Sequence, residues 1–491
     1  MLSGLWEREW SVPTPGGVAK ATRGAPGESG LGGPRGRNVN LDNTGTAWLV
    51  HIAVVGARPA LGTPWREGFV ENVGVVGLGY VGLPLAMEFA EAGLRVTGVE
   101  KDPEKLSVLA EGESYVEDVS PERLAPLVSS GAINATDDYA TLGEVDAVIL
   151  CLPTPLDANR EPDLSMLVDG TKEMARSIRP GTLIVLESTT YPGTTREVLM
   201  PILGGDGLRV GEGFFLAFSP ERVDPGNKRF TIRNTPKIVG GVTEECTRRA
   251  ADLYGTIVEE VHVVSGPESA EFSKLLENIF RGVNIALINE ISLLCNRMGV
   301  DVWEVVEAAR TKPFGFMPFY PGPGLGGHCI PIDPFYLSWR ARAFDMTTEF
   351  IELAGRVNVN MPYHAVARVS AALNAHAKPL NSSRVLLLGV GYKPNVGDTR
   401  ESPALKMFEL LREAGARVSY HDPHVPSLPP GKDASVGLSA EELALTDCVV
   451  VVTDHDGVDL GLVVENAPLV VDLRNAVRKR LGRLPENVEV L

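Results

Sequence analysis

The sequence predicts an α/β protein with two Rossmann-like, doubly wound domains joined by a central helical region that contains one long helix. From Asn72, short apolar runs alternate with amphipathic helical segments, which is typical of a parallel sheet covered on both faces. The same alternation restarts at Arg384. Between the two lies a helical pattern from about Pro267 to Met298, and Gly266-Pro267 suits a helix entry with proline in the first turn.

Changes in this pattern set the expected domain boundaries. Residues 11–46 are rich in Gly, Pro, Thr and Arg without a sustained period, so residues 1–70 are expected to be a disordered extension. The first α/β domain is expected at 71–262, the central helical region at 263–378 and the second α/β domain at 379–491. The expected strands are Val73–Val76, Arg95–Val99, Asp146–Cys151, Thr182–Glu187, Phe214–Phe218, Arg384–Leu388, Arg417–Tyr420, Asp447–Thr453 and Leu469–Asp472, with a further helix near Ser402–Ala414.

Composition narrows the class of protein. The chain has 491 residues, of which 44% are hydrophobic and 22% charged, the balance of an ordinary globular protein. Its formal charge of −17 argues against a nucleic-acid binder, which needs a basic surface. No apolar run reaches the roughly 18 residues of a membrane span, and the run from Ala47 to Ala57 is too short and too far from Met1 for a normal signal peptide. The five cysteines form no CxxC pair, which predicts a cytoplasmic protein without a metal site.

A dinucleotide site is predicted where the first strand runs into Gly77-Leu78-Gly79-Tyr80-Val81-Gly82. Gly77 permits a tight turn, Gly79 lets the backbone approach a pyrophosphate, and Gly82 lets the following helix pack closely. Glu100 ends the next apolar run, where a carboxylate accepts hydrogen bonds from ribose hydroxyls and favours NAD over NADP. Lys105 nearby softens that preference. The alternative is a purely structural glycine turn.

The most informative segment is Gly324-Leu-Gly-Gly-His-Cys-Ile-Pro-Ile-Asp333, which follows a proline-rich stretch without secondary-structure period. Glycines around Cys329 allow a substrate and a nicotinamide to come close to its sulfur. This pattern predicts covalent aldehyde chemistry, in which the thiolate attacks a carbonyl and leaves a hemithioacetal that can give up a hydride. The alternatives are a buried structural cysteine, or a metal bound through His328, for which no partner ligands occur at usable spacing.

Other polar residues are expected around this cysteine. Lys274, Asn278 and Arg281 form one stripe on the long helix, where Lys and Asn can donate to an alkoxide or hemithioacetal oxygen; a solvated face is an equal alternative. Asp333 can accept a proton or else cap the helix near Pro334. Glu221, Thr154 and Thr189 follow strands of the first sheet and are further candidates; the alternative for each is an ordinary strand-end turn. Lys393 lies in a second glycine turn that lacks the third glycine, where a side chain suits a phosphate contact.

Taken together, these motifs resemble the UDP-glucose/GDP-mannose dehydrogenase family from about Asn72 to the C-terminus. The resemblance is carried by GLGYVGLP, the Ser188-Thr189 turn, the SPE motif ending at Glu221, Lys274-xxx-Asn278, GGHCIPIDP and the segment from Tyr392 to Pro403. It implies an NAD domain, a helical dimerisation region and a UDP-sugar-binding domain, and a four-electron oxidation of an alcohol through a thiohemiacetal and a thioester. By this resemblance Cys329 is the nucleophile, Lys274 and Asn278 stabilise the oxyanion, Asp333 handles protons with Thr189 and a water, and Glu221 assists thioester hydrolysis.

The resemblance also implies binding residues. Thr154, Ser188, Thr189 and Arg400 match cofactor contacts, together with the glycine turn. Lys393 matches a contact near the substrate diphosphate. We further expect the substrate to contact Glu221, Arg222, Lys274, Asn278, Arg281, Tyr320 and Gly326.

Two departures from the family pattern bear on the substrate. Pro225 stands where many UDP-glucose members carry a second acid, and the stretch Pro313–Pro323 replaces their arginine-containing loop. Both are similar to the bacterial branch that acts on UDP-N-acetylhexosamines, so UDP-N-acetylglucosamine is the expected substrate and a uronic acid for a polysaccharide the expected product. The alternatives are UDP-glucose or UDP-N-acetylmannosamine as substrate, or a catalytically silent protein that only binds a nucleotide sugar.

Overall fold

The computed structural model describes residues 70–491, apart from residues 117, 158, 206, 225, 226, 228, 328, 329 and 429–433. The expected disordered extension at 1–70 therefore lies, except for Val70, outside the described residues, as do Pro225, His328 and Cys329. Within the described part of the chain, no helix is long and apolar enough to cross a membrane.

The first α/β unit is built on an eight-stranded sheet with the order β3-β2-β1-β4-β5-β6-β7-β8. All neighbouring strands pair in parallel except β6 and β7. The strands are β1 (Asn72–Val76), β2 (Arg95–Val99), β3 (Ile133–Thr136), β4 (Ala147–Leu150), β5 (Leu183–Leu186), β6 (Phe215–Phe218), β7 (Lys237–Gly241) and β8 (Val261–Val263).

Alternate residues of these strands enter two different cores. On β4, Ile149 packs into a core with α1 and α6, whereas Val148 and Leu150 pack into the opposite core with α4. Since both faces are covered, the central strands β4, β5 and β6 are continuously apolar, as the sequence predicted. The helices of this unit are α1 (Gly82–Glu91), α2 (Pro103–Ala110), α3 (Pro121–Ser129), η1 (Tyr139–Glu144), α4 (Ser165–Ala175), η2 (Thr195–Leu199), α5 (Met200–Leu203) and α6 (Glu244–Tyr254).

The antiparallel pairing of β6 with β7 departs from the expected all-parallel sheet. A parallel neighbour needs a crossover connection, usually a helix. The described residues between Phe218 and Lys237 form no helix, so the chain returns directly along the edge of β6. This return brings Lys237 to the end of the sheet where β6 finishes.

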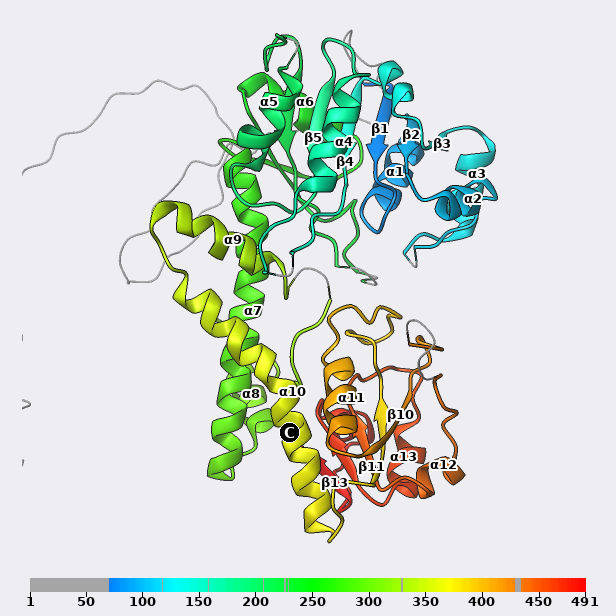
Figure 1. The fold of residues 1–491 in the computed structure, drawn as a ribbon, viewed down its shortest axis with the longest axis vertical. Helices are drawn as coiled ribbons and strands as arrows, with labels where there is room; N and C mark the ends of the chain where they lie inside the picture. The colour runs from blue at the N-terminus through cyan, green and yellow to red at the C-terminus, as the bar shows by residue number, and fades with distance from the viewer. Residues whose placement is uncertain are drawn as a thin grey trace, which may run out of the picture. The chain divides into compact units, whose positions relative to one another are not determined.

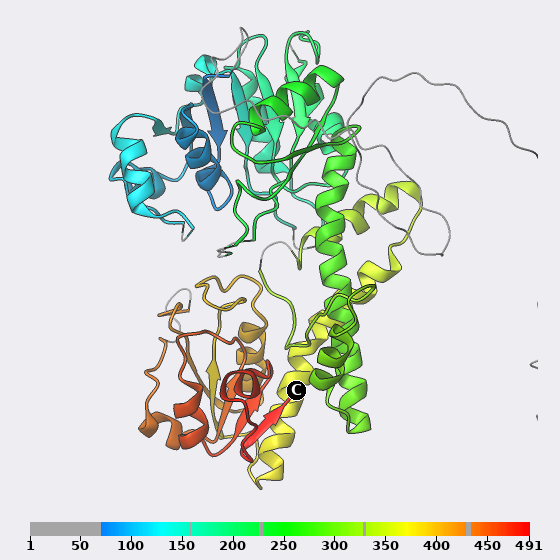
Figure 2. The same cartoon turned by 180° about the vertical axis from the view of Figure 1, so that it is seen from behind.

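The central region contains the predicted long helix, α7 (Pro267–Met298), at the predicted bounds. It ends at Gly299, whose φ of 69° is the left-handed conformation that terminates helices. A second long helix, which the sequence did not single out, is α10 (Glu349–Ala375), and it packs along α7 (Figures 1 and 2). Asn289 of α7 donates to Asn358 of α10 at 3.0 Å in this buried contact. The shorter helices are α8 (Val302–Arg310), α9 (Asp333–Ala341) and η3 (Arg342–Phe344).

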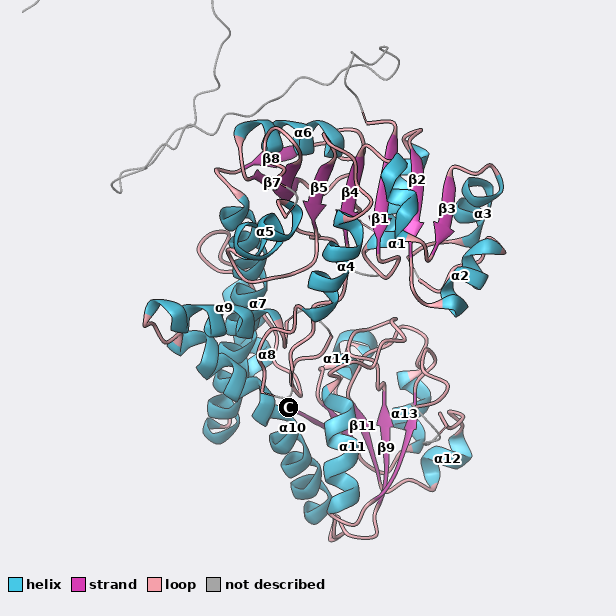
Figure 3. Ribbon diagram, turned by 45° about the horizontal axis from the view of Figure 1, so that its top comes forward, coloured by secondary structure: helices cyan, strands magenta, loops and turns pink. Residues whose placement is uncertain are grey.

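The second α/β unit has a parallel five-stranded sheet with the order β10-β9-β11-β12-β13, and helices flank it (Figure 3). One core joins it to α10 and α11, and the opposite core to α13 and α14. Its elements are β9 (Arg384–Leu388), α11 (Pro403–Glu413), β10 (Arg417–His421), α12 (Ala440–Ala444), β11 (Cys448–Val451), α13 (Leu460–Asn466), β12 (Val470–Asp472), α14 (Ala476–Leu481) and β13 (Val488–Val490).

Strand order reverses once in each sheet, between β1 and β4 in the first and between β9 and β11 in the second. Ligands of such sheets bind in the crevice outside the carboxyl ends of the strands at this reversal. In the first sheet the crevice is flanked by the glycine turn after β1 and by the loop from Cys151 to Thr154 after β4. The fold therefore places the glycine turn and the predicted residues that follow β4, β5 and β6 at one sheet edge.

Candidate active site

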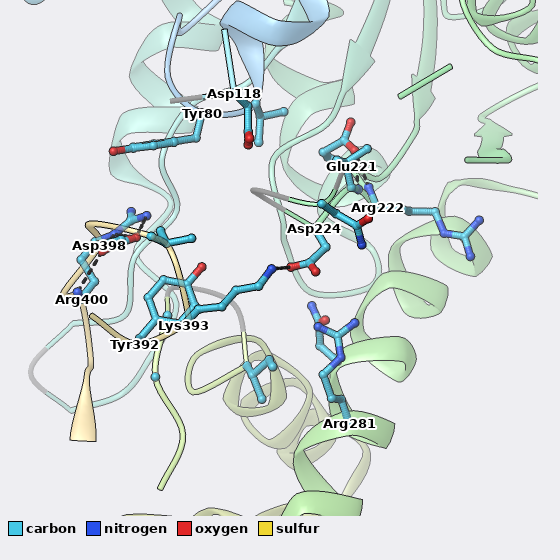
Figure 4. A pocket seen from close by; sticks show the side chains of 18 of the residues that line it. Tyr80, Asp118, Glu221, Arg222, Asp224, Arg281, Tyr392, Lys393, Asp398 and Arg400 are labelled. Carbon is cyan, nitrogen blue, oxygen red and sulfur yellow. Dashed lines mark hydrogen bonds and ion pairs between the residues drawn. The ribbon is translucent and has the colours of Figure 1, made fainter. Parts of the chain in front are cut away.

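One large cleft collects side chains from both α/β units and from α7 (Figure 4). Its volume of about 1340 Å³ exceeds the roughly 300–1,000 Å³ of an ordinary small-molecule site, so it has room for two ligands. Most of the predicted site residues line it. They are Gly79, Tyr80, Val81, Lys105, Thr154, Ser188, Thr189, Glu221, Arg222, Lys274, Asn278, Arg281, Tyr320, Gly326, Asp333, Lys393 and Arg400.

The glycine turn has the geometry of a pyrophosphate cradle. A side chain at Gly82 would place its Cβ 1.9 Å from the Gly77 carbonyl oxygen, so only glycine permits this close approach. At Gly79 a Cβ would meet nothing within 4 Å, which leaves the backbone there open to a ligand. Helix α1 begins at Gly82, so its N-terminus faces the same space and favours an anion. These residues fit a bound dinucleotide.

Glu100 directly follows β2, as predicted, but its carboxylate is engaged by the protein. It accepts hydrogen bonds from the backbone N–H groups of Leu78 at 3.2 Å, Lys101 at 2.9 Å and Asp102 at 3.2 Å. Lys105 lies 3.6 Å from it. A carboxylate held in this way keeps lone pairs for a ribose hydroxyl and also fixes the glycine turn.

Two loops at the sheet edge are tied together by the predicted hydroxyl residues. The Thr154 hydroxyl donates to the Thr189 carbonyl oxygen at 2.7 Å, and the Ser188 hydroxyl donates to the Leu152 carbonyl oxygen at 2.7 Å. The loops after β4 and β5 are therefore held as one wall of the cleft.

Helix α7 carries the predicted polar stripe into the cleft. Asn278 is 5% exposed, and its amide donates to the Asp333 carboxylate at 2.5 Å. The Lys274 ammonium donates to the Glu221 carbonyl oxygen, which does not exhaust its three donors. Asp333 lies in the first turn of α9, and Ile332 occupies the N-cap position of this helix. Asp333 is therefore not the N-cap residue of α9.

Burial raises the pKa of Asp333 to about 6, against the opposing effects of Lys274 and the Asn278 hydrogen bond. Such a carboxyl group can exchange a proton near neutral pH.

Glu221 has the opposite electrostatic setting. Burial alone would raise its pKa, but Lys237 and hydrogen bonds from the backbone outweigh burial and lower the pKa below the usual value. Lys237 lies 3.0 Å from the Glu221 carboxylate and 3.0 Å from that of Glu187. The N–H groups of Arg222 and Val223 each donate to the other Glu221 oxygen at 2.7 Å. The cleft thus holds one carboxyl that can titrate and one that stays charged, a pairing that separates proton transfer from charge stabilisation.

The loop that contains Cys329 is described only on either side of that residue, so the prediction for Cys329 itself lies outside the described residues. Gly327 and Ile330 both line the cleft. The Gly327 N–H donates to the Arg400 carbonyl oxygen at 2.9 Å, and a Cβ at Gly326 would lie 2.6 Å from the Tyr392 side chain. The start of this loop therefore packs against the turn that follows β9.

The second α/β unit contributes cationic side chains to the cleft, among them the predicted Lys393 and Arg400. Lys393 extends towards Asp224 and forms an ion pair with it at 2.7 Å (Figure 4). The Arg400 guanidinium stands 5.3 Å from the ring centre of Tyr80 in the glycine turn and pairs with Asp398. Both side chains reach residues of the first unit, so the cleft is closed by both α/β units.

Three further residues that were predicted to contact the substrate line the cleft, and they differ in how firmly other groups hold their side chains. Arg222 is engaged with Glu277 and with the Pro236 carbonyl oxygen, so it anchors its own loop. The Tyr320 hydroxyl donates to Glu307 at 2.6 Å and its ring stacks on Trp303. Arg281 is exposed on α7.

Sequence analysis missed the buried Lys237, with Glu187 and Tyr254 beside it, and the cleft-lining Arg474. Lys237 is 4% exposed, and nothing in the run Thr235-Pro-Lys-Ile-Val-Gly-Gly241 distinguishes it from a lysine at the solvated start of a strand. In the sequence, Glu187 ends an expected strand and opens the Glu187-Ser-Thr-Thr turn, without a predicted role of its own. A buried lysine is rare unless it is paired, but the pairing becomes visible only in three dimensions.

A dinucleotide cradle and an acid–lysine–asparagine cluster in one cleft define an NAD-dependent oxidoreductase of the doubly wound class. Models of the UDP-glucose/GDP-mannose dehydrogenase family match the chain along most of its length: the NAD binding domain at residues 71–258, the central domain at 268–360 and the UDP binding domain at 386–479. The chain belongs to this family, and it is an NAD-dependent dehydrogenase of nucleotide sugars.

Curated relatives and solved structures agree with the family. UDP-N-acetyl-D-glucosamine 6-dehydrogenase of Pseudomonas aeruginosa is 36% identical over 356 residues, 72% of this chain and 83% of the relative. UDP-N-acetyl-D-mannosamine dehydrogenase of Pyrococcus horikoshii is 36% identical over 388 residues, 78% of this chain and 89% of the relative. A solved structure of the UDP-D-ManNAc dehydrogenase from Pyrococcus horikoshii superimposes with a TM-score of 0.78 at 32% identity, covering 85% of this chain and 98% of that one.

Proposed function

We propose that this enzyme oxidises the C6 alcohol of a UDP-N-acetylhexosamine, with UDP-N-acetylglucosamine preferred, to the carboxylate in two NAD-dependent steps, through a covalent intermediate on Cys329. The observation that carries this proposal is the convergence of Lys274, Asn278, Asp333 and Glu221 on the same cleft as the described ends of the cysteine loop.

The residues divide the chemistry between them. Asp333, with its pKa near 6, accepts the proton of the substrate alcohol, with Thr189 and a water. The Lys274 ammonium and the Asn278 amide stabilise the developing oxyanion. NAD bound at the glycine turn accepts the hydride in each oxidation. The Cys329 thiolate adds to the aldehyde carbon, so the aldehyde is held rather than released.

Hydrolysis completes the reaction. A water attacks the thioester carbon, the carbon–sulfur bond breaks, and the sulfur leaves as the thiolate. Glu221, held as an anion in the cleft wall, accepts a hydrogen bond from that water. The net reaction consumes one sugar alcohol, two NAD⁺ and one water, and yields one sugar carboxylate, two NADH and three protons.

The N-acetylhexosamine assignment rests on two features of the chain. Pro225 lies in the segment after Glu221 where an acid characterises UDP-glucose members, and Pro313–Pro323 contains no arginine. A loop without that arginine leaves room for an N-acetyl group. UDP-N-acetylmannosamine is the second candidate, because several relatives at 32–36% identity are named for that substrate.

A panel of UDP-sugars tests the assignment. The purified protein is given UDP-N-acetylglucosamine, UDP-N-acetylmannosamine, UDP-N-acetylgalactosamine or UDP-glucose with NAD, and both NADH and the sugar product are quantified. We expect the highest kcat/KM with UDP-N-acetylglucosamine and two NADH for each uronic acid. Preference for UDP-glucose would overturn the substrate assignment, and no NADH with any of the four would overturn the enzymatic function.

We further propose that the enzyme works as a homo-oligomer through α7. Six large apolar residues on this helix are 42–66% exposed. Contiguous exposed apolar surface of this kind commonly marks an interaction site. The residues are Phe272, Leu276, Phe280, Leu287, Leu294 and Met298. Light scattering after gel filtration tests this: Leu287→Glu is expected to lower the mass of the assembly, and an unchanged mass would exclude the α7 interface.

The proposed compartment is the cytoplasm. The four described cysteines are free thiols, and a reducing compartment preserves such thiols.

A further inference from the structure

The buried lysine of the cleft wall carries an inference beyond the residues of the proposed mechanism. We infer that Lys237 is a positioning residue, which from the first position of β7 holds the Glu221 carboxylate in place and in its charged form. The inference rests on the proposed function, in which Glu221 assists thioester hydrolysis.

Backbone pairing brings the two residues together. β7 runs antiparallel to β6, with Phe218 opposite Gly240, and the same register continued along both segments sets Lys237 opposite Glu221. The side chains meet there, with 3.0 Å between the Lys237 ammonium and the Glu221 carboxylate. The chain returns antiparallel after β6, unlike in the expected parallel sheet. This return places Lys237 beside a carboxylate that lines the cleft.

Lys237 is placed to act on charge rather than on substrate. Its side chain is 4% exposed and it is not among the cleft-lining residues of the described chain, whereas Glu221 lines the cleft and its side chain is 14% exposed. A buried ammonium without partners would destabilise the fold, and here two carboxylates flank the Lys237 ammonium. Lys237 therefore acts on the reaction through its paired carboxylates, of which that of Glu221 is the more exposed, at 14% against 0% for Glu187.

Glu187 supplies the second carboxylate and makes the network asymmetric. Its side chain is fully buried, and it accepts a hydrogen bond from Tyr254 of α6, whose ring lies 5.1 Å from the Lys237 ammonium. Burial raises the pKa of Glu187, whereas the pKa of Glu221 stays below its usual value. The charge of Lys237 is shared between the two carboxylates. Removing Lys237 should therefore raise the pKa of Glu221, whereas removing the charge of Glu187 should lower it.

Other titratable groups face this network from every element around it. Cys151 follows β4, and burial raises the pKa of its thiol well above the usual value. Lys274 of α7 donates to the backbone carbonyl of Glu221. Lys274 thus fixes the chain of Glu221, while Lys237 fixes its carboxylate.

The step that depends on Glu221 is the attack of water on the thioester, after both hydrides have left. Loss of Lys237 should therefore slow hydrolysis and leave the two oxidations largely intact. We expect Lys237→Met to give a burst of about two NADH per active site followed by a slow steady state, with the acylated enzyme visible by mass spectrometry. The acid limb of kcat should move to higher pH by about 1–3 units, the usual effect of removing an opposite charge at this distance.

Three companion variants separate positioning from folding. Lys237→Arg keeps the charge and is expected to hold the wild-type pH profile. Glu187→Gln leaves Lys237 paired with Glu221 alone, which lowers the pKa of Glu221 further, so the acid limb of acyl-enzyme hydrolysis, measured in single turnovers, should move to lower pH. Glu187→Gln combined with Lys237→Met removes one charge of each sign and should lie closer to wild type than Lys237→Met alone.

The inference is overturned if Lys237→Met shows no burst and an unshifted acid limb. If Lys237→Met does not fold, Glu187→Gln decides, and an unmoved acid limb in that variant would sink the inference. A wild-type enzyme that produces no NADH from any UDP-sugar refutes the proposed function instead, before any variant is compared.

Discussion

Asn278 of α7 donates a 2.5 Å hydrogen bond to the carboxylate of Asp333 in the first turn of α9, and with burial and Lys274 this bond determines the pKa of Asp333. Donation to the charged form favours ionisation, while burial of Asp333 opposes it and prevails, with the pKa raised to about 6. The two residues are far apart in the sequence, so α7 and α9 must stay packed for the pair to exist.

The first prediction concerns pH. Asp333 must be ionised to accept a proton, so kcat/KM should fall as the pH drops through about 6. Asn278→Ala removes a hydrogen bond that favours the ionised form, which should raise the Asp333 pKa and move the acid limb to higher pH. The measurement is kcat/KM for the preferred UDP-sugar between pH 5 and 9.

Asn284→Ala is the matched control for this variant. Asn284 lies on the same helix but bonds only locally, to the Phe280 carbonyl oxygen at 2.7 Å. Its profile should coincide with that of the wild type. An Asn278→Ala profile that also coincides would show that Asp333 is not the titrating base.

The second prediction uses the contrast between two glycines of the same turn. Ala at Gly79 has open space around it, so Gly79→Ala should fold normally but intrude on the pyrophosphate and raise the KM for NAD about tenfold or more. Ala at Gly82 would clash with the Gly77 carbonyl oxygen at 1.9 Å, so Gly82→Ala should lower the thermal midpoint instead. Thermal unfolding and NAD titration of both variants check this, and an unchanged KM in Gly79→Ala would argue against a cofactor at the turn.

Features that depend on neighbouring residues in the sequence could be predicted, whereas features that depend on contacts between distant segments could not. Helix α7 was predicted at both ends because its boundaries are local: Gly266-Pro267 at the start and Gly299 after the end. The strands β1, β2, β4–β6 and β9–β12 were predicted because apolar runs indicate burial, whereas β3, β7, β8 and β13 were not predicted. In contrast, the direction of β7 depends on a connection without any helix, and no local pattern distinguishes it from a parallel strand.

The site shows the same division. Gly77 and Gly82 were predictable because each answers a local steric demand, and Gly79 because it belongs to the same short motif. Lys237 was not, because its burial depends on Glu187 and Glu221, which approach it from two other segments of the chain. The predicted cation Lys393 lines the cleft, but its ion pair with Asp224 joins segments that no local pattern connects.

The third prediction concerns stability. Glu271 of α7 is fully buried and accepts hydrogen bonds from the N–H groups of Gly193 and Thr195 and from the Thr195 hydroxyl, at 2.6–2.8 Å. Glu271→Ala leaves these donors unsatisfied, at about 1–3 kcal/mol for each buried group. Glu268→Ala is the control, because its ion pair with Arg196 is about 40% exposed and should contribute about 0–1 kcal/mol. Urea unfolding of both variants checks the difference, and equal midpoints would contradict it.

The fourth prediction concerns Lys393. Its ion pair with Asp224 is partly exposed, so a substrate diphosphate can replace Asp224 as the partner of the ammonium. Lys393→Ala should raise the KM for the UDP-sugar with little effect on kcat or on the KM for NAD. Asp224→Asn should have the reverse effect on the UDP-sugar KM, because it frees Lys393 from a competing anion. Steady-state kinetics of both variants test the exchange, and parallel changes in the two KM values would contradict it.

The last prediction concerns Cys329, the proposed nucleophile. Cys329→Ala removes the nucleophile, so no thioester forms and turnover to the uronic acid should be lost. Cys329→Ser keeps a hydroxyl, but at neutral pH almost no alkoxide forms and an ester is a poorer acyl donor than a thioester. Cys329→Ser should therefore stop before the second oxidation, with at most one NADH per active site. Cys295→Ser is the control, because this buried thiol packs against Val302 and Trp303 and is not itself among the cleft-lining residues of the described chain, and it should retain two NADH per sugar. Two NADH per sugar from Cys329→Ala at the wild-type rate would remove the covalent step, because both oxidations would then proceed without any sulfur at that position.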